Sequence, residues 1–429
     1  MPDSPAPRKR WFLKGLAILG QLLGALVLLA ALVVIVREQI PWTLDAAGAD
    51  ERWQRIALTA ATIVALLCGL RHGLRRPRQI GRALVCFAIA AIAGWLWLAW
   101  DDPKLDFPPE DYLSAADSPE AEASHALVLR YRSGEDSRLP AGLPDLREPH
   151  SLAGNKTPTN EQWTAFVTEH RDEIQQGWDQ LADHRAWIAE MAAAPRLADL
   201  TTSIGDPIPS FRDLRAPARY MTWQARALAL EGRGDEALAE VATLLAVSQK
   251  LTPESRTLVR GMIAVVMQKM ALQTADFVLT TTETSTESRT HLLAVVTARQ
   301  NPADAARLLV WSDYPISANG LLSMGAQMDA NSLEGQWPYA HRVFFNPRAT
   351  ANLLGDYFNT LSHHASARNF DAMKMQENVA YDRARAWRLK NLSGHLFLAM
   401  AAPAFSKITE SHWQTEDLAA ALEARLRAQ

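Results

Sequence analysis

The sequence predicts an all-α protein: N-terminal transmembrane helices followed by a mostly α-helical soluble domain built of helical hairpins. Two observations carry this prediction. Uncharged apolar runs of membrane-spanning length lie within the first 100 residues. Beyond residue 158, hydrophobic residues recur at three- and four-residue steps, the spacing of one helix face. The sequence has no series of alternating β-branched segments separated by hairpin turns, which argues against a sheet.

Charge divides the 429 residues into two contrasting parts. The first 100 residues carry 12 Lys and Arg against 5 Asp and Glu, a net charge of +7. The other 329 residues carry 32 basic and 42 acidic residues, a net charge of −10. An acidic body disfavours nucleic acid as its partner. The basic, apolar head is typical of a membrane anchor, so the lipid bilayer is its expected partner.

Three segments of the head, about 15–36, 56–70 and 83–100, are predicted to cross the membrane. The first is longer than the apolar region of a signal peptide and ends on Val-Val-Ile-Val without a small-residue cleavage site, which favours a retained anchor. The second has only 15 residues, and a buried or interfacial helix is its alternative. Gly20 and Gly24 form a G-x-x-x-G pair in the first segment, which fits either packing within the head or homodimerisation.

Loop charges orient these segments. The connection 71–82 carries five arginines and no acidic residue, and four basic residues precede the first span. By the positive-inside rule both lie in the cytoplasm. Three crossings then place the C-terminal domain outside it, so the expected location is the bacterial inner membrane, multi-pass, with a periplasmic body. The two cysteines, Cys68 and Cys86, lie in predicted spans, so the body has no disulfide or cysteine metal site.

The chain is predicted to comprise an anchor (1–100), a juxtamembrane linker with a short helix (101–158) and an α-helical domain (159–429). Residues 201–218 contain three prolines and are predicted to form a loop. One long or broken helix is expected over 160–193, and further helices near 217–231, 235–250, from Pro253 to about 279, 287–299, 302–310, 347–362 (or onward to 388), 391–400 and 415–428.

Residues 220–241 resemble one tetratricopeptide unit through Trp223, Ala227 and the run Gly234-Asp235-Glu236-Ala237-Leu238. The likeness implies a helix, a Gly-containing turn and a second helix. The closing proline comes late, at Pro253, and no second copy follows at a 34-residue period, whereas solenoids need about three repeats. A peptide-binding tetratricopeptide groove is therefore not expected.

Three further pieces resemble a loosely defined set of uncharacterised bacterial inner-membrane proteins with a helical body. They are Arg-Thr-Leu-Val-Arg-Gly-Met-Ile-Ala (256–264), Phe-Asn-Pro-Arg-Ala-Thr-Ala-Asn (345–352) and Asn-Leu-Ser-Gly-His-Leu (391–396). The resemblance implies an N-terminal anchor and a helical body. It brings no known reaction.

The sequence predicts no catalytic, cofactor-binding or metal-ligating residues. It contains no G-x-S-x-G elbow, S-x-x-K, P-loop or G-x-G-x-x-G motif. The adjacent pair His363-His364 would point about 100° apart on a helix, which does not suit one metal ion. The strongest ligand or partner surface in the sequence is an aromatic and polar segment with four candidate residues: Trp337, Tyr339, His341 and Arg342.

These features predict a membrane-anchored interaction or scaffold protein with a protein partner in the cell envelope, and no cofactor. The alternative is a hydrolase-like periplasmic enzyme whose site is assembled around Trp337–Arg342. A deep cleft with convergent carboxylates or histidines would favour the enzyme. A groove on a helical surface would favour the interaction protein.

Overall fold

The computed structural model describes the secondary structure of residues 31, 35, 39–40, 49–75, 80–102, 104–113, 118–132, 138–149, 158–203, 205–332, 344–380, 391–401 and 405–428. These residues form helices joined by loops, and their β pairing is limited to an isolated antiparallel bridge between Arg132 and Pro209. The predicted all-α class is confirmed.

The chain divides into two compact units that are discontinuous in sequence. The hairpin unit comprises residues 1–104, 324–350 and 382–400, and the helical body comprises residues 105–323, 351–381 and 401–429. The sequence prediction instead treated anchor, linker and domain as three successive segments, and assigned 324–350 and 382–400 to the domain.

Two long helices of the hairpin unit, α3 (Ala49–Arg75) and α4 (Ile80–Ala99), contain most of the second and third predicted spans and pack against each other. The segment 15–36, with Gly20 and Gly24, falls outside the described residues except at positions 31 and 35.

On α3 and α4 several small residues are buried and many large apolar ones are exposed, although Arg55 and Trp97 are buried as well. Buried positions on the two helices include the small residues Thr59, Thr62, Ala65, Ala90 and Ala93. Large apolar side chains are exposed instead: Val64, Leu67, Val85, Phe87, Ile89, Ile92 and Leu96. Small residues at the contact and large apolar residues outside are typical of helices that pack within lipid.

A buried polar cluster lies where α4 ends and where α16 (Pro347–Ser366) and α19 (Leu392–Ala401) begin. The amide side chain of Asn391 accepts hydrogen bonds from the Asn346 backbone N–H (2.9 Å) and from the Thr350 hydroxyl (3.1 Å). Asn346 donates through Nδ2 to the Leu98 carbonyl at 3.2 Å. The carboxylate of Asp101 accepts from two backbone N–H groups in the first turn of α16. Two motifs, 345–352 and 391–396, therefore meet here.

The described helices of the body begin with the short η3 (Pro109–Tyr112). They continue as α5 (Pro119–Val128), α7 (Asn160–Glu169), α8 (Arg171–Gln180), α9 (Ala182–Ala193), α10 (Phe211–Leu230), α11 (Gly234–Leu251), α12 (Leu258–Thr281), α13 (Thr286–Thr297), α14 (Pro302–Trp311), α17 (Phe370–Ala380) and α20 (Ser406–Ala428). Helices α15 (Tyr314–Ser332), α16 and α19 have residues in both units.

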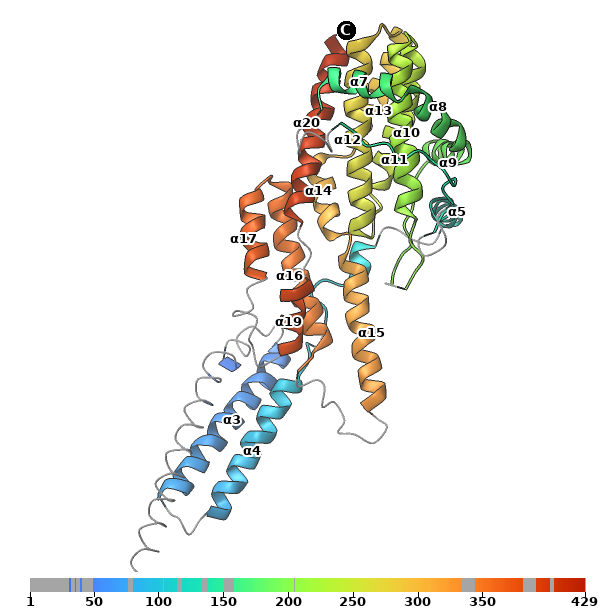
Figure 1. Ribbon diagram of the computed structural model, residues 1–429. Helices are drawn as coiled ribbons and strands as arrows, with labels where there is room; N and C mark the ends of the chain where they lie inside the picture. Colours follow the sequence, from blue (N-terminus) through green and yellow to red (C-terminus); the bar gives the residue numbers. More distant parts are fainter. Residues whose placement is uncertain are drawn as a thin grey trace, which may run out of the picture. The chain divides into compact units, whose positions relative to one another are not determined.

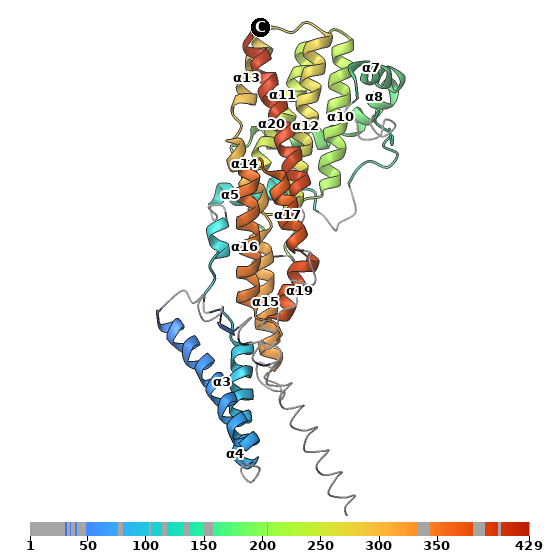
Figure 2. The same ribbon diagram turned by 90° about the vertical axis from the view of Figure 1, so that its left-hand side faces the viewer.

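The core of the body is a bundle around α12, which packs against α10, α11 and α20 (Figures 1 and 2). Helices α7, α8 and α9 cover one side of the α10–α11 pair. The largest fully buried side chains of the bundle and of the helices that cover it include Trp187, Trp223 and Phe277. Gly232, with φ of +79°, ends α10 in the left-handed region that favours glycine, and α11 begins two residues later.

Helix α12 is the one described helix that is long and apolar enough to cross a membrane, and 56% of its most apolar 18-residue window is buried. Helix α12 is surrounded by other helices of the bundle, and a central core helix is hydrophobic on all sides, so its place in the core explains its apolar composition.

Several predicted helix boundaries were wrong. Helix α20 begins at Ser406 and not near 415, and α15 lies where no helix was predicted. The predicted loop 201–218 ends at Ser210, because Ser210 caps α10 by accepting from the Asp213 N–H, and Pro217 lies inside the helix. Conversely, Pro253 does not start a helix. Helix α12 begins at Leu258, capped by the side chain of Thr257.

Candidate functional site

The four residues predicted to form a ligand or partner surface, Trp337, Tyr339, His341 and Arg342, lie outside the described residues. The surface they would form remains a prediction. The histidine pair lies near the end of α16, where the Nδ1 atom of exposed His363 is 2.7 Å from the Asn359 carbonyl oxygen. Among the described residues, no group of three or more His, Cys, Asp or Glu side chains is arranged to hold a metal ion.

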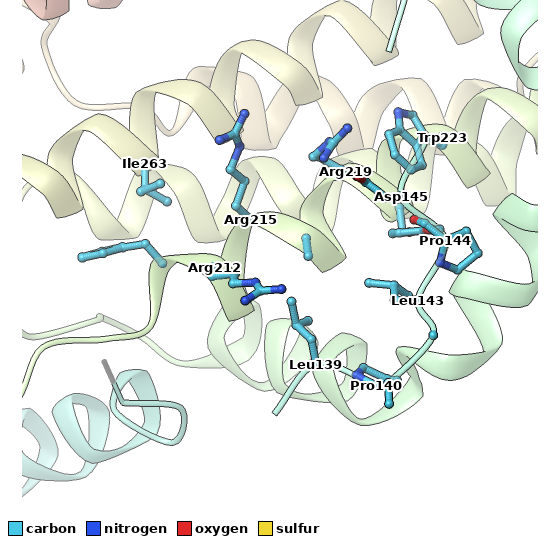
Figure 3. A pocket seen from close by; sticks show the side chains of 15 residues that line it. Leu139, Pro140, Leu143, Pro144, Asp145, Arg212, Arg215, Arg219, Trp223 and Ile263 are labelled. Atoms are coloured by element: carbon cyan, nitrogen blue, oxygen red, sulfur yellow. The ribbon is translucent and has the colours of Figure 1, made fainter. Parts of the chain in front are cut away.

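The most distinctive surface of the body is an open cleft of about 850 Å³ between loop 138–149 and the N-terminal half of α10 (Figure 3). We name it the arginine cleft. Its lining consists of Leu139, Pro140, Ala141, Gly142, Leu143, Pro144, Asp145, Phe211, Arg212, Arg215, Ala216, Arg219, Tyr220, Trp223 and Ile263.

Helical spacing brings the three arginines to one side of α10. Arg212, Arg215 and Arg219 are separated by three and four residues, and such positions are neighbours on a helix surface. The guanidinium groups of Arg212 and Arg215 stand beside the open space in Figure 3. This arrangement depends on α10 starting at Phe211, because Arg212 and Arg215 both precede Pro217 and would otherwise lie in a loop.

Arg219 is fixed and forms part of the wall. Its Nε atom donates to Glu148 Oε1 at 3.1 Å and its Nη2 atom to the Leu146 carbonyl at 3.1 Å. Its guanidinium carbon lies 4.8 Å from the ring centroid of Trp223, within cation–π distance. Both loop contacts come from residues 146–148, so Arg219 holds the loop against α10.

Tyr220 forms the second attachment of the loop. Its hydroxyl donates to the Pro144 carbonyl at 2.6 Å, and burial raises the pKa of Tyr220 to about 12, so the hydroxyl keeps its proton. The ring lies directly against Gly177 of α8, at a position where a Cβ atom would overlap it. The cleft therefore has a wall that is preformed by hydrogen bonds and close packing.

Arg212 and Arg215 are different because both are exposed and neither forms an ion pair or hydrogen bond with any described residue. Among the described residues that line the cleft, Asp145 is the one acidic residue. The arginine cleft thus has an excess of cations inside an otherwise acidic body. Two unpaired guanidinium forks next to half-buried apolar side chains are suited to an oxyanion attached to an apolar group.

Two other clefts of the body are not cationic. The one beside α14, about 440 Å³, is lined by three carboxylates and two arginines, and its Glu254 is paired with Arg196. The one beside α20, about 550 Å³, is lined by Asp276 and Asp417 with a single lysine. The cleft beside α14 has one arginine, Arg307, without an ion pair to a described residue, and it lies among three carboxylates. Neither cleft combines two such arginines with an apolar wall, which makes the arginine cleft the stronger candidate site.

A buried His–Asp–Ser group lies at the start of α10, but its arrangement is structural. His184 Nε2 is 3.6 Å from Asp213 Oδ1, and the Ser210 hydroxyl donates to the other oxygen of the same carboxylate. In a nucleophilic triad the serine would face the histidine instead. The ring of Tyr131 stacks on His184 at 4.5 Å and encloses it. Burial lowers the pKa of His184, partly opposed by Asp213.

The two arginines of the motif 256–264 are likewise buried and structural. Arg260 is 1% exposed and donates to the carbonyls of Leu197, Ala198 and Leu251. Arg256 donates its backbone N–H to Asp199 at 3.0 Å. These contacts attach segment 197–201 to the start of α12.

The sequence prediction missed the arginine cleft because three prolines at 207, 209 and 217 indicated a loop. The signal that identifies the helix start is Ser210-x-x-Asp213, which matches a capping pattern ahead of Leu214. With the helix extended to residue 211, the spacing of Arg212, Arg215 and Arg219 follows. The approach of loop 138–149 has no comparable local signal.

No protein-family model, curated protein or solved structure matches this chain. The tetratricopeptide likeness and the likeness to bacterial inner-membrane proteins therefore remain predictions. The geometry of the described residues carries the functional argument.

Proposed function

We propose that this chain is a membrane-anchored helical interaction protein of the bacterial cell envelope. In this proposal the N-terminal helices hold the chain in the inner membrane. The helical body lies in the periplasm and presents the arginine cleft to a protein partner.

The anchor is supported by the packing of α3 and α4. Helix α4 includes an apolar stretch, Val85–Ala99. Leu67 and Ile92 are 60% exposed while Ala65 and Ala93 are about 5% exposed. In water this distribution would leave a row of large apolar side chains hydrated, at a cost of about 25 cal/mol per Å² of apolar surface. In lipid the same side chains face acyl chains, and the small residues allow close helix contact.

The orientation is supported by the five arginines between residues 71 and 82, which favour a cytoplasmic connection between α3 and α4. Helix α4 would then run outward and deliver residue 105, the first of the body, to the periplasm.

The observation that carries the interaction role is the pair Arg212 and Arg215. Within residues 101–429, which carry a net charge of −10, these two exposed arginines have no acidic partner among the described residues and lie beside a wall of half-buried apolar side chains. Cationic and apolar groups that converge on an open, preformed cleft are suited to capturing a segment of another protein.

Site-specific photocrosslinking in intact cells tests this proposal. A benzoylphenylalanine at position 143 in the cleft should give a discrete crosslinked protein band from the membrane fraction. The same probe at position 375, an exposed methionine of α17 that does not line the cleft, is the control because it is at least as accessible to a partner and distant in sequence. Absence of the chain from the membrane fraction, or equal crosslinking from both positions, would contradict the proposal.

A further inference from the structure

We propose that the arginine cleft recognises an acidic peptide segment in which Asp or Glu alternates with large apolar side chains. This inference rests on the proposed function and specifies the chemistry of the partner. Three properties of the cleft support it: the unpaired cations, the apolar wall and the fixed loop.

The cations define the acidic part of the segment. Arg212 and Arg215 are three residues apart on α10, so their Cβ atoms are roughly 5–6 Å from each other. Both side chains are exposed and make no ion pair with any described residue. A guanidinium group forms bidentate hydrogen bonds with a carboxylate. Two neighbouring guanidinium groups can bind one carboxylate together or two successive carboxylates.

The wall defines the apolar part. Leu139 and Leu143 of the loop, Phe211 of α10 and Ile263 of α12 line the cleft and are only partly buried. A simple inorganic anion would use the arginines and leave these side chains hydrated. A segment with Leu or Phe beside its carboxylate would cover them, and each well-buried large side chain contributes about 1.5–3 kcal/mol.

The loop gives the cleft the form of a preformed groove. Arg219 holds the loop at Leu146 and Glu148, and Tyr220 holds it at Pro144. A groove that exists before binding has a smaller ordering cost when the ligand arrives. The groove is also open to solvent along the loop, which suits an extended chain passing through it.

Charge favours a protein segment over a lipid surface. An anionic bilayer presents many negative charges to the whole face of the protein, and residues 101–429, with a net charge of −10, are repelled by such a surface. A short acidic segment contacts the two arginines directly and does not bring the rest of the acidic surface close to other negative charges.

The direct test is fluorescence anisotropy with the full chain in detergent and defined probes. The binding probe is a fluorescein-labelled peptide with the core Asp-Leu-Glu-Phe-Asp. A charge control replaces its acids with Asn and Gln, and an apolar control replaces Leu and Phe with Ser. Vesicles containing 30% phosphatidylglycerol form a separate arm, measured by flotation.

Two double variants lose the same charge. R212Q/R215Q removes both unpaired guanidinium groups of the cleft. R289Q/R307Q removes arginines of α13 and α14 that do not line it. We expect R212Q/R215Q to lower the affinity for the acidic probe at least tenfold. R289Q/R307Q should change that affinity less than twofold. Both control peptides should bind at least tenfold more weakly than the acidic probe, and added NaCl should weaken wild-type binding.

Several results would overturn this inference. They are no binding of the acidic probe, equal binding by the two double variants, equal binding of a control peptide, and Arg212/Arg215-dependent binding of the vesicles in place of the peptide. The proposed function fails separately. If the R212Q/R215Q variant still gives the position-143 crosslink in cells, the interaction role stands and the acidic-segment inference is wrong.

Discussion

Asp199 and Arg260 form a buried ion pair, with Oδ2 and Nη1 3.7 Å apart and side chains 2% and 1% exposed. Burying such charges is costly unless their hydrogen bonds are satisfied. Here Asp199 also accepts from the backbone N–H groups of Thr201 and Arg256, while Arg260 donates to three carbonyls. The pair therefore joins segment 197–201 to the first turn of the central helix α12.

We predict that Asp199→Ala destabilises the body by about 3–5 kcal/mol, because it leaves the Arg260 guanidinium buried without its carboxylate. Thermal unfolding of the full chain in detergent, followed by tryptophan fluorescence, measures the effect. The control Asp179→Ala removes an exposed carboxylate and should cost less than about 0.5 kcal/mol. Equal shifts of the two midpoints would contradict the importance of the buried pair.

Gly177 and Tyr220 give a second prediction, which links packing to the arginine cleft. Gly177→Ala places a methyl group where the Tyr220 ring lies, which should cost about 1–3 kcal/mol and loosen the hydroxyl contact to Pro144. Because that contact holds the cleft loop, Gly177→Ala should also weaken binding of the acidic probe. Gly320→Ala in α15 meets no atom within 4 Å and should instead stabilise by about 0.5–1 kcal/mol. A neutral effect of Gly177→Ala on both stability and binding would contradict the prediction.

Arg226 is fully buried in α10, and no carboxylate among the described residues lies within ion-pair distance of it. It stacks on Trp163 at 4.0 Å and donates to the Thr222 carbonyl, and burial lowers its pKa to about 9. We predict that Arg226→Met raises the free energy of unfolding by about 1 kcal/mol, because the cost of burying the charge disappears while the packing volume is kept.

Arg226→Lys is the matched comparison, because it keeps the charge and loses the planar contact with Trp163. It should lower the midpoint of thermal unfolding below that of the wild type. If the methionine variant were less stable than the lysine variant, the charge itself would be required for the fold.

Stability should fall as the solution is acidified below neutral pH, with His184 as one cause. Burial lowers the pKa of His184 in the folded chain below its ordinary value, so the unfolded chain takes up the proton first. The unfolding free energy is therefore unaffected well above pH 6.5 and decreases as the pH drops below it. His125 and His412 act in the same direction, because burial also lowers their pKa values.

Unfolding midpoints at pH 7.5 and 5.5 measure this dependence. His184→Gln should reduce the difference between the two midpoints, since one of the titrating groups is removed. His291→Gln, at an exposed position of α13, should leave the difference unchanged. A lower unfolding midpoint at pH 7.5 than at pH 5.5 in the wild type would contradict this pH dependence.

The sequence predicted helices where hydrophobic periodicity is strong, and failed mainly at boundaries set by tertiary contacts. The single long or broken helix expected over 160–193 is three helices, α7, α8 and α9, which break near His170 and Leu181. No proline or glycine marks these breaks. The breaks arise where the chain changes direction to pack against α10 and α11. The local sequence pattern does not predict such tertiary contacts.

The candidate site was harder to predict than the fold because its two sides are far apart in sequence. Arg219 and Glu148 are 71 residues apart, and Tyr220 and Pro144 are 76 apart. Helical spacing predicts that Arg212, Arg215 and Arg219 share a face once α10 is extended to residue 211. The loop that completes the cleft is known only from the fold. Motifs 256–264, 345–352 and 391–396 proved to form buried polar contacts, so their distinctive residues have structural roles.

The central claim is that membrane-spanning helices separate the body from the cytoplasm, and paired reporter fusions test it most directly. A reporter that is active only in the cytoplasm and one that is active only in the periplasm are each fused after residue 76 and after residue 110. We predict cytoplasmic activity at residue 76 and periplasmic activity at residue 110. Activity on the same side at both positions would contradict the claim.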